Sequence, residues 1–574
     1  MHKLKKNRLE TVMEESQSCE KQIYSEEYAD YILETGGNVE KIRRLFQPDC
    51  IQIIDGNFVT IFENIRTQGE ISFQKHGYGA VPKCFGLLDT SSIESTGALR
   101  VRRRQNFDLN GNGVLVGFVD TGIDYKNPLF QNADGSSRIA YIWDQTLQSE
   151  KHPEGIDYGT EFNQMEITEA LKNPTTSALP HTDPLYHGTF MAAIAAGNVD
   201  ESADFTGIVP NAEIIMVKLK EAKQNIKDFY GIPMDVPCYQ ENDIMMGIRY
   251  LWEMAGRLRR PIAICLGIGS NAGSHTGLSP LGTTINDIGN ISGICMVMSA
   301  GNETNLGHHF EGTVEGNSER QVEVDIENTS LTIELWTNSI GYLAVGITSP
   351  GGEFSGRIPI RSFEQRIDFV FDTTRVFIHY ERVEYYSGEE VIVLRFQEAV
   401  SGIWKIHVYN SEESTAQFHI WLPVRNFISE RTTFLEPSPD TIICNPGNVN
   451  RGITIGAYNH RDNSIFINSS RGFTSNNMIK PDVVAPGVDV YAPVSALRFG
   501  ERSGTSIAAA HGAGCAAMLL EWGIVRENNM GMNSVTAKYY FIKGARHNNI
   551  TVPSKSFGWG ELDIYNTFDR LRLY

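Results

Sequence analysis

The sequence lacks the segments that mark export or membrane insertion. Residues 1–8 are basic, but residues 9–21 are polar and acidic, so the apolar core of a secretory signal peptide is not visible. No run of about 18 apolar residues is present to span a membrane. We therefore expect synthesis in the cytoplasm and no membrane span.

Cysteine is sparse, and its spacing carries no ligand pattern. The eight cysteines are scattered without a CxxC pair, which argues against a zinc site. Cys265, Cys295 and Cys515 lie in apolar or small-residue runs. The sequence therefore predicts free, buried thiols in a reducing compartment, with no metal ion and no cofactor.

Long basic runs are also absent. The 50 Lys and Arg residues against 69 Asp and Glu residues give a formal net charge of −19. This balance argues against nucleic acid or an anionic membrane as the main partner. The 574 residues, 41% of them apolar, can bury a large core and suggest more than one domain.

Two segments place a reactive side chain where an apolar run meets a glycine. Residues 504–512 put Ser506 in the first turn of a small-residue helix, where backbone N–H groups favour developing negative charge. Taken alone, this segment is more typical of an Ala/Gly-rich packing helix. Residues 116–124 predict a buried strand that ends in the carboxylate of Asp120.

Two further segments supply a base and an amide. Residues 187–197 predict a second small-residue helix, opened by His187, and residues 298–303 end an apolar strand at Asn302, whose amide could donate to an oxyanion. The chain order Asp, His, Ser is that of the subtilisin arrangement, and the other two hydrolase orders do not match.

Together with residues 479–487, these segments make the chain resemble the subtilisin-like serine proteases. The resemblance implies that Ser506 attacks the scissile carbonyl, that His187 takes its proton, and that Asp120 holds the imidazole. It also implies that Asn302 and the backbone N–H of Ser506 stabilise the oxyanion. Two positions depart from the family: Ala510 stands where proline is usual, and Phe190 replaces a second histidine.

A substrate-binding strand is implied by the same resemblance. Residues 264–270 are similar to the family's strand along which an extended peptide lies, with Cys265 in place of the usual serine. The implied pocket residues are Leu266, Gly267, Ser299, Ala300 and Gly301. His181 and Asp183, close to His187, suggest a metal cluster, but such residues are usual in loops and we do not expect one.

The first 90 residues predict a small α+β unit. Residues 38–46 have helical spacing, and residues 51–54 and 57–62 are typical of strands. The unit resembles a subtilase prodomain, which folds against the catalytic domain and fills its cleft; an unrelated binding domain is the alternative. We expect the protease to cut its own chain within Phe85–Ser91 and residues 1–90 to stay bound.

The remaining chain divides into an α/β domain and an insertion. Alternating strands and helices predict a parallel sheet with helices on both faces, over residues 91–309 and 426–574. Residues 310–425 predict an inserted β-sandwich, since several segments alternate with a period of two between turn signals. These segments are residues 321–326, 331–336, 391–396 and 402–409.

This architecture resembles the Csp spore-germination proteases of clostridia. In that group the sandwich is a jelly roll, the self-cut prodomain stays bound, and the protein substrate is the precursor of a cortex-degrading enzyme. The resemblance implies an endopeptidase that is incorporated into the spore and acts by limited proteolysis. The alternatives are a catalytically silent, germinant-sensing homologue and a broad-specificity degradative protease, which the missing export signal disfavours.

Overall fold

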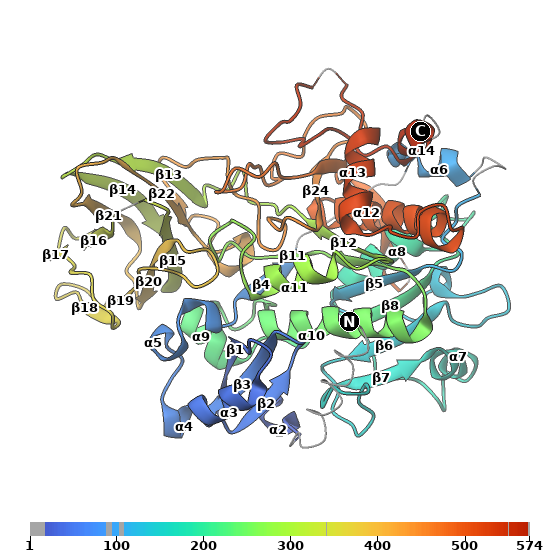
Figure 1. The fold of residues 1–574 in the computed structure, drawn as a ribbon, viewed down its shortest axis with the longest axis horizontal. Coiled ribbons are helices and arrows are strands. Elements are labelled where there is room, and N and C mark those ends of the chain that lie inside the picture. The colour runs from blue at the N-terminus through green and yellow to red at the C-terminus, as the bar shows by residue number, and fades with distance from the viewer. Residues whose placement is uncertain are drawn as a thin grey trace.

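An eight-stranded sheet forms the centre of the molecule (Figure 1). The computed structural model describes residues 18–87, 94–102, 108–339, 341–496, 498–548 and 550–571. Neighbouring strands of the central sheet run parallel, except for the pair β6–β7. In spatial order the strands are β25 (Val483–Pro486), β24 (Ile453–Tyr458), β12 (Ile294–Ser299), β10 (Ile262–Leu266), β5 (Leu115–Asp120), β8 (Glu213–Lys218), β6 (Ile139–Asp144) and β7 (Thr160–Asn163).

Helices cover both faces of this sheet, as the sequence predicted. In β5, Val116 and Phe118 point into one core, whereas Leu115 and Val119 point into the other. Both sides of the strand are therefore buried, which explains its continuous apolar run. One face carries α8 (His187–Ala196) and α12 (Thr505–Leu520), and the other carries α10 (Glu241–Leu258) and α11 (Pro280–Ile288). The closing helices are α13 (Ser534–Gly544) and α14 (Ile564–Leu571).

One helical stretch among the described residues, Thr505–Val525, is long and apolar enough to cross a membrane. Its apolar window is 89% buried inside the protein, and the stretch contains α12. The apolar character of this helix is therefore explained by its place in the core.

Two antiparallel sheets, here called the sandwich, pack face to face at one end of the molecule (Figure 1). Their strands include the four segments with period-two alternation, and the edge strand β23 (Thr433–Phe434) extends the sandwich beyond residue 425. One sheet contains β13 (His309–Val314), β22 (Ala416–Trp421), β15 (Ser330–Thr337), β20 (Glu390–Gln397), β19 (Arg375–Glu381) and β18 (Gln365–Asp368). The other contains β17 (Phe354–Arg357), β16 (Leu343–Thr348), β21 (Gly402–Asn410), β14 (Glu319–Ile326) and β23.

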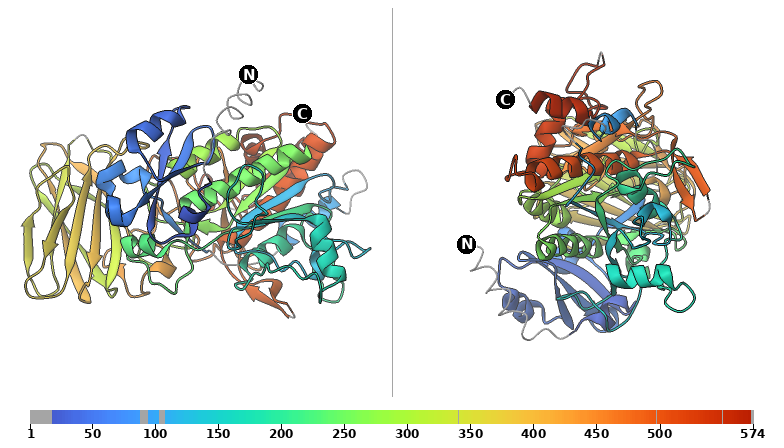
Figure 2. Two further views of the ribbon diagram at one scale, coloured as in Figure 1. Left: turned by 90° about the horizontal axis from the view of Figure 1, so that it is seen from below. Right: turned by 90° about the vertical axis from the view of Figure 1, so that its right-hand side faces the viewer.

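The amino-terminal unit lies beside the junction of the sandwich and the α/β domain, as Figure 1 and Figure 2 show together. Its antiparallel sheet has the order β1 (Tyr28–Glu34), β3 (Phe58–Asn64), β2 (Cys50–Ile53), with helices α2 (Glu20–Tyr24) and α3 (Val39–Phe46). Phe58 and Phe62 of β3 share a buried core with residues of α10. The carboxylate of Asp30 accepts hydrogen bonds from Lys223, Gln240 and Asn242. The unit is therefore docked through both apolar and charged contacts.

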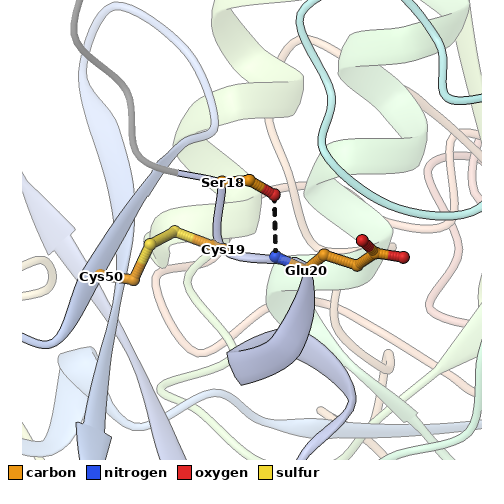
Figure 3. Close-up of a disulfide and its surroundings, with 4 residues drawn as sticks. All are labelled: Ser18, Cys19, Glu20 and Cys50. Atoms are coloured by element: carbon orange, nitrogen blue, oxygen red, sulfur yellow. Dashed lines mark hydrogen bonds between the residues drawn. A yellow bond between two sulfur atoms is a disulfide. The ribbon is translucent and has the colours of Figure 1, made fainter. Parts of the chain in front are cut away.

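One of the cysteine predictions is wrong. Cys19 and Cys50 form a disulfide that ties the residue before α2 to the first residue of β2 (Figure 3). The two residues are 31 positions apart and no spacing motif joins them, so only the folded unit brings the sulfurs together. The other six cysteines are free and buried, as predicted.

Removing this disulfide is expected to destabilise the amino-terminal unit. In the chain-entropy view, a loop closed across 31 residues contributes about 3–4 kcal/mol. Cys19→Ser and Cys50→Ser should therefore lower the first thermal unfolding transition equally, and dithiothreitol should lower it in the wild type. Cys295→Ser is the matched control without a disulfide. A wild-type melting curve unchanged by dithiothreitol would contradict the assignment.

Three histidines surround a tryptophan where the sandwich meets the α/β domain. The ring of His275 stacks on Trp421 of β22 at 4.0 Å between centroids, and His309 and His419 stack at 5.0 and 5.1 Å. Nε2 of His309 is 3.0 Å from Nδ1 of His419. Burial lowers the pKa of His275 to about 4, and burial also lowers the pKa of His309 and His419. This junction is therefore stable with neutral rings.

Stability is expected to fall as the pH drops below about 6.5. Below this pH the histidines are protonated in the unfolded chain but stay neutral in the folded one. The free energy of unfolding therefore decreases from pH 6.5 down to the folded-state pKa. His275 alone accounts for about 2 kcal/mol between pH 7.5 and 5. His275→Gln should flatten this loss in denaturant titrations at the two pH values, whereas His152→Gln, outside the cluster, should not. An equal loss in all three proteins would rule out this role.

Candidate active site

Three polar side chains meet at the carboxyl edge of the central sheet. Asp120 is the last residue of β5, His187 is the first residue of α8, and Ser506 is the second residue of α12. Nδ1 of His187 lies 2.7 Å from Oδ1 of Asp120, and its Nε2 lies 3.3 Å from Oγ of Ser506. All three are buried. The three residues predicted from separate motifs thus form a continuous carboxylate–imidazole–hydroxyl chain.

The backbone around His187 is fitted closely to the loop after β5. A Cβ atom on Gly188 would lie 2.2 Å from the carbonyl oxygen of Gly122, so only glycine permits this approach. Tyr186 precedes the helix with a φ of 56°, and its hydroxyl donates to the carboxylate of Asp124. Helix α8 therefore begins where its first side chain reaches Asp120.

Asp183 links the loop after β5 to the start of α8. Its carboxylate accepts from the hydroxyl of Thr121 at 2.7 Å, and from the backbone N–H and hydroxyl of Thr189 at 2.9 and 2.7 Å. Thr121 follows Asp120, and Thr189 lies two residues after His187. Asp183 is therefore a positioning residue, a role that the sequence did not indicate.

His181 is hydrogen-bonded at both ring nitrogens. Its Nε2 accepts the N–H of Ile123, so the proton is on Nδ1, which is 2.6 Å from the carboxylate of Asp144. Burial alone would raise the pKa of Asp144, but the hydrogen bond from His181 and the charge of Lys218 at 3.8 Å lower it. In the described parts of the chain, no group of three or more His, Cys, Asp or Glu side chains could hold a metal ion.

The contacts of Asp120 determine which nitrogen of His187 carries a proton. Oδ1 of Asp120 accepts the N–H of Thr121 at 2.7 Å and faces Nδ1 of the imidazole. A carboxylate oxygen in this position requires a proton on Nδ1. Nε2 is then left with its lone pair toward Ser506, which is the geometry of a base that removes a hydroxyl proton.

Asn302 is oriented by the helix that carries Ser506. Its Oδ1 accepts the backbone N–H of Thr505 at 3.0 Å and the Thr505 hydroxyl at 3.1 Å. Because a backbone N–H can only donate, the carboxamide oxygen is fixed toward Thr505 and the amide nitrogen is left to donate elsewhere. The first N–H groups of α12 have no partner within the helix. An amide and a helix N-terminus therefore lie together beside Ser506.

The predicted substrate-binding residues lie around this centre. A Cβ atom on Gly267 would be 3.1 Å from Cε1 of His187 and 3.1 Å from Cβ of Ser506. Gly301 has a φ of 109° and donates its N–H to the Thr505 hydroxyl at 3.1 Å. Leu266 and Ser299 end the neighbouring strands β10 and β12, and Ala300 follows. The structure thus gathers all five residues; glycine is required at Gly301, and Gly267 leaves little room for a side chain.

A strand from the amino-terminal unit pairs with two short strands beside this centre. Strand β4 (Cys84–Leu87) runs antiparallel to β11 (Ile268–Gly269) and to β9 (Tyr239–Gln240). Leu87 pairs with Ile268, which follows Gly267 beside the His187 and Ser506 side chains. The carboxyl end of β4 is therefore the end paired beside Gly267, and residues 88–91 of the predicted cut site lie outside the described residues.

Comparisons with known proteins show the family and the fold of the chain. Residues 111–366 and 435–560 match the model of the subtilase family (Peptidase_S8). The structure is similar to that of the Clostridium perfringens CspB protease, with a TM-score of 0.74, 28% identity, and coverage of 83% of this chain and 97% of that one.

Two sequence relatives match only segments of the chain. The subtilisin-like protease SBT2.2 of Arabidopsis thaliana is 29% identical over 172 residues, 27% of this chain and 20% of its own length. Guanine deaminase of Escherichia coli is 26% identical over 137 residues, 22% of this chain and 30% of its own length. The family match and the structural neighbour cover far more of the chain than either segment.

Proposed function

Because the chain belongs to the subtilase family, we propose that it is a serine endopeptidase with Ser506 as its nucleophile. The observation that supports this most directly is the contact chain from Asp120 through His187 to Ser506. A catalytically silent homologue is disfavoured, because each residue of the chain is present and within hydrogen-bonding reach of the next.

In the proposed reaction, Oγ of Ser506 attacks the scissile carbonyl while Nε2 of His187 takes the hydroxyl proton. Asp120 holds the imidazole in the required tautomer and stabilises its cationic form. The carbonyl oxygen becomes an oxyanion that accepts from the amide of Asn302 and the backbone N–H of Ser506. The same imidazole then protonates the leaving amine, and water releases the acyl group.

We also propose that the amino-terminal unit is a prodomain that the enzyme cuts from itself within Phe85–Ser91. Support comes from β4, which pairs with β9 and β11 as a bound peptide would. The docking contacts elsewhere, such as Asp30 with Lys223, do not depend on the cut bond. The cut unit is therefore expected to remain bound.

The proposed substrate is a protein precursor activated by limited proteolysis. The similarity to the Clostridium perfringens CspB protease supports a role in spore germination, with the precursor of a cortex hydrolase as the substrate. A groove already filled by the enzyme's own strand also suits a protease that acts on few bonds, rather than a degradative enzyme.

Ser506→Ala is expected to abolish both peptidase activity and self-cleavage. The wild type should run as two fragments on a denaturing gel and elute as one species from a sizing column. The variant should run as a single chain, because the hydroxyl that faces His187 is removed. Ser503→Ala, three residues earlier, is the matched control and should be cut normally. A Ser506→Ala chain still cut within Phe85–Ser91 would show that another protease makes the cut.

Asn302→Ala is expected to lower kcat by about 10²–10³, since one oxyanion donor contributes about 3 kcal/mol. KM should change little, because the amide acts on the transition state more than on the bound substrate. Steady-state kinetics on a fluorogenic peptide check this, with circular dichroism as the folding control. A kcat within twofold of the wild type would remove Asn302 from the mechanism.

A further inference from the structure

Strand β4 presents its side chains alternately to two different surroundings. Phe85 is fully buried in the core that includes α10, and Leu87 packs against the same core. Cys84 belongs to the opposite core, which also contains Val424 and Phe427. Gly86, two residues along the strand from Cys84, faces the same way. The strand therefore separates the α/β domain from a second wall of the groove.

The second wall is contributed by the chain that leaves the sandwich. Val424 follows β22, and Phe427 ends the short helix η5 (Arg425–Phe427) that precedes β23. A Cβ atom on Gly86 would lie 3.5 Å from Cε1 of Phe427 and 3.6 Å from Cγ2 of Val424. Alanine would fit at these distances, whereas a longer side chain would have to pass or displace the Phe427 ring and the Val424 side chain.

A cavity lies beside Cys84, two residues before Gly86. It has a volume of about 40 Å³ and lies between the α/β domain and the sandwich. Its lining includes Tyr230 and Ser270 on one side and Thr332 and Glu334 on the other, and Val424 and Phe427 border it as well. The groove is thus tight at the position of Gly86 and has unused space two residues earlier.

We propose that Val424 and Phe427 are specificity-determining residues for this protease. They limit the substrate residue opposite Gly269, now Gly86, to glycine or alanine, whereas the residue paired with Gln240, now Cys84, can be larger. The substrate class is then a protein segment in extended conformation. It carries a small residue in the place of Gly86 and an aromatic or aliphatic residue in the place of Phe85. The inference rests on the proposed peptidase function and adds the inserted sandwich to the substrate-binding groove.

A double-mutant cycle on the full chain tests the wall without requiring activity. In a Ser506→Ala background, Gly86→Leu should lower the melting temperature by several degrees, and combining it with Phe427→Ala should cost less than the sum of the two changes. Gly86 does not have a positive φ, so the effect is not backbone strain. Cys84→Leu, on the same face but beside the cavity, is the matched control and should be tolerated better. Additive effects of Gly86→Leu and Phe427→Ala would overturn the proposal.

The rate of self-cleavage provides the second measurement. In the active chain made by cell-free synthesis, Gly86→Leu should slow the appearance of the cut fragments about tenfold or more, and Phe427→Ala should restore much of the rate. Leu87→Phe, on the opposite face, should show no such rescue. Equal rates for the wild type and the Gly86→Leu variant would overturn the specificity role. If the wild type itself were never cut, the proposed function would fail, while the stability cycle would still decide whether the wall exists.

Discussion

The pairing of β4 with β9 and β11 is the interaction on which the arrangement of the three parts depends. Both neighbours are two-residue strands of the α/β domain, and without β4 each would present unpaired N–H and C=O groups at the cleft. A strand inserted between them satisfies both edges at once. It also brings the amino-terminal unit next to the sandwich. One face of β4 packs against the α/β domain, and the opposite face packs against Val424 and Phe427.

A buried carboxylate strengthens the same junction. Glu334 of β15 accepts from the Tyr78 hydroxyl at 2.7 and 2.8 Å, from the N–H of Gly273 at 2.9 Å, and from the Trp336 indole at 3.0 Å. The first donor belongs to the amino-terminal unit, the second to the α/β domain and the third to the sandwich. Burial raises the pKa of Glu334, and each of these donors helps to offset the cost of burying the carboxylate. The docking of each part therefore stabilises the docking of the other two.

The candidate site could be predicted because its residues carry local signals. Asp120 ends a strand, His187 and Ser506 lie in the first turn of a helix, and Asn302 follows three residues after a strand, so a short apolar or small-residue run makes each position visible. Asp183 carries no such signal, since its role appears only when the loop before α8 meets the loop after β5.

Contacts between residues far apart in the chain could not be predicted either, because they also carry no local signal. Cys19 and Cys50 meet only after the amino-terminal unit has folded, and Phe427 reaches β4 only because the chain returns from the sandwich beside the cleft. The alternation of apolar residues predicted the sandwich strands themselves, but nothing in that pattern indicates which surface the sandwich covers. The family match is likewise interrupted between residues 366 and 435, where both wall residues lie.

If β4 and the substrate use the same groove, cutting the chain after β4 does not by itself open the site. The amino-terminal unit stays held by the contact of its sheet with α10 and by the buried pair of Asp30 and Lys223. These contacts keep β4 at a high effective concentration beside β9 and β11, as a linker would. A protein substrate must therefore displace β4 while the rest of the amino-terminal unit remains bound. Its side chains must then fit against the wall formed by Val424 and Phe427. Selectivity then follows from competition between the substrate and β4 for the same strand partners. A substrate competes well only when its residue in the place of Gly86 is as small.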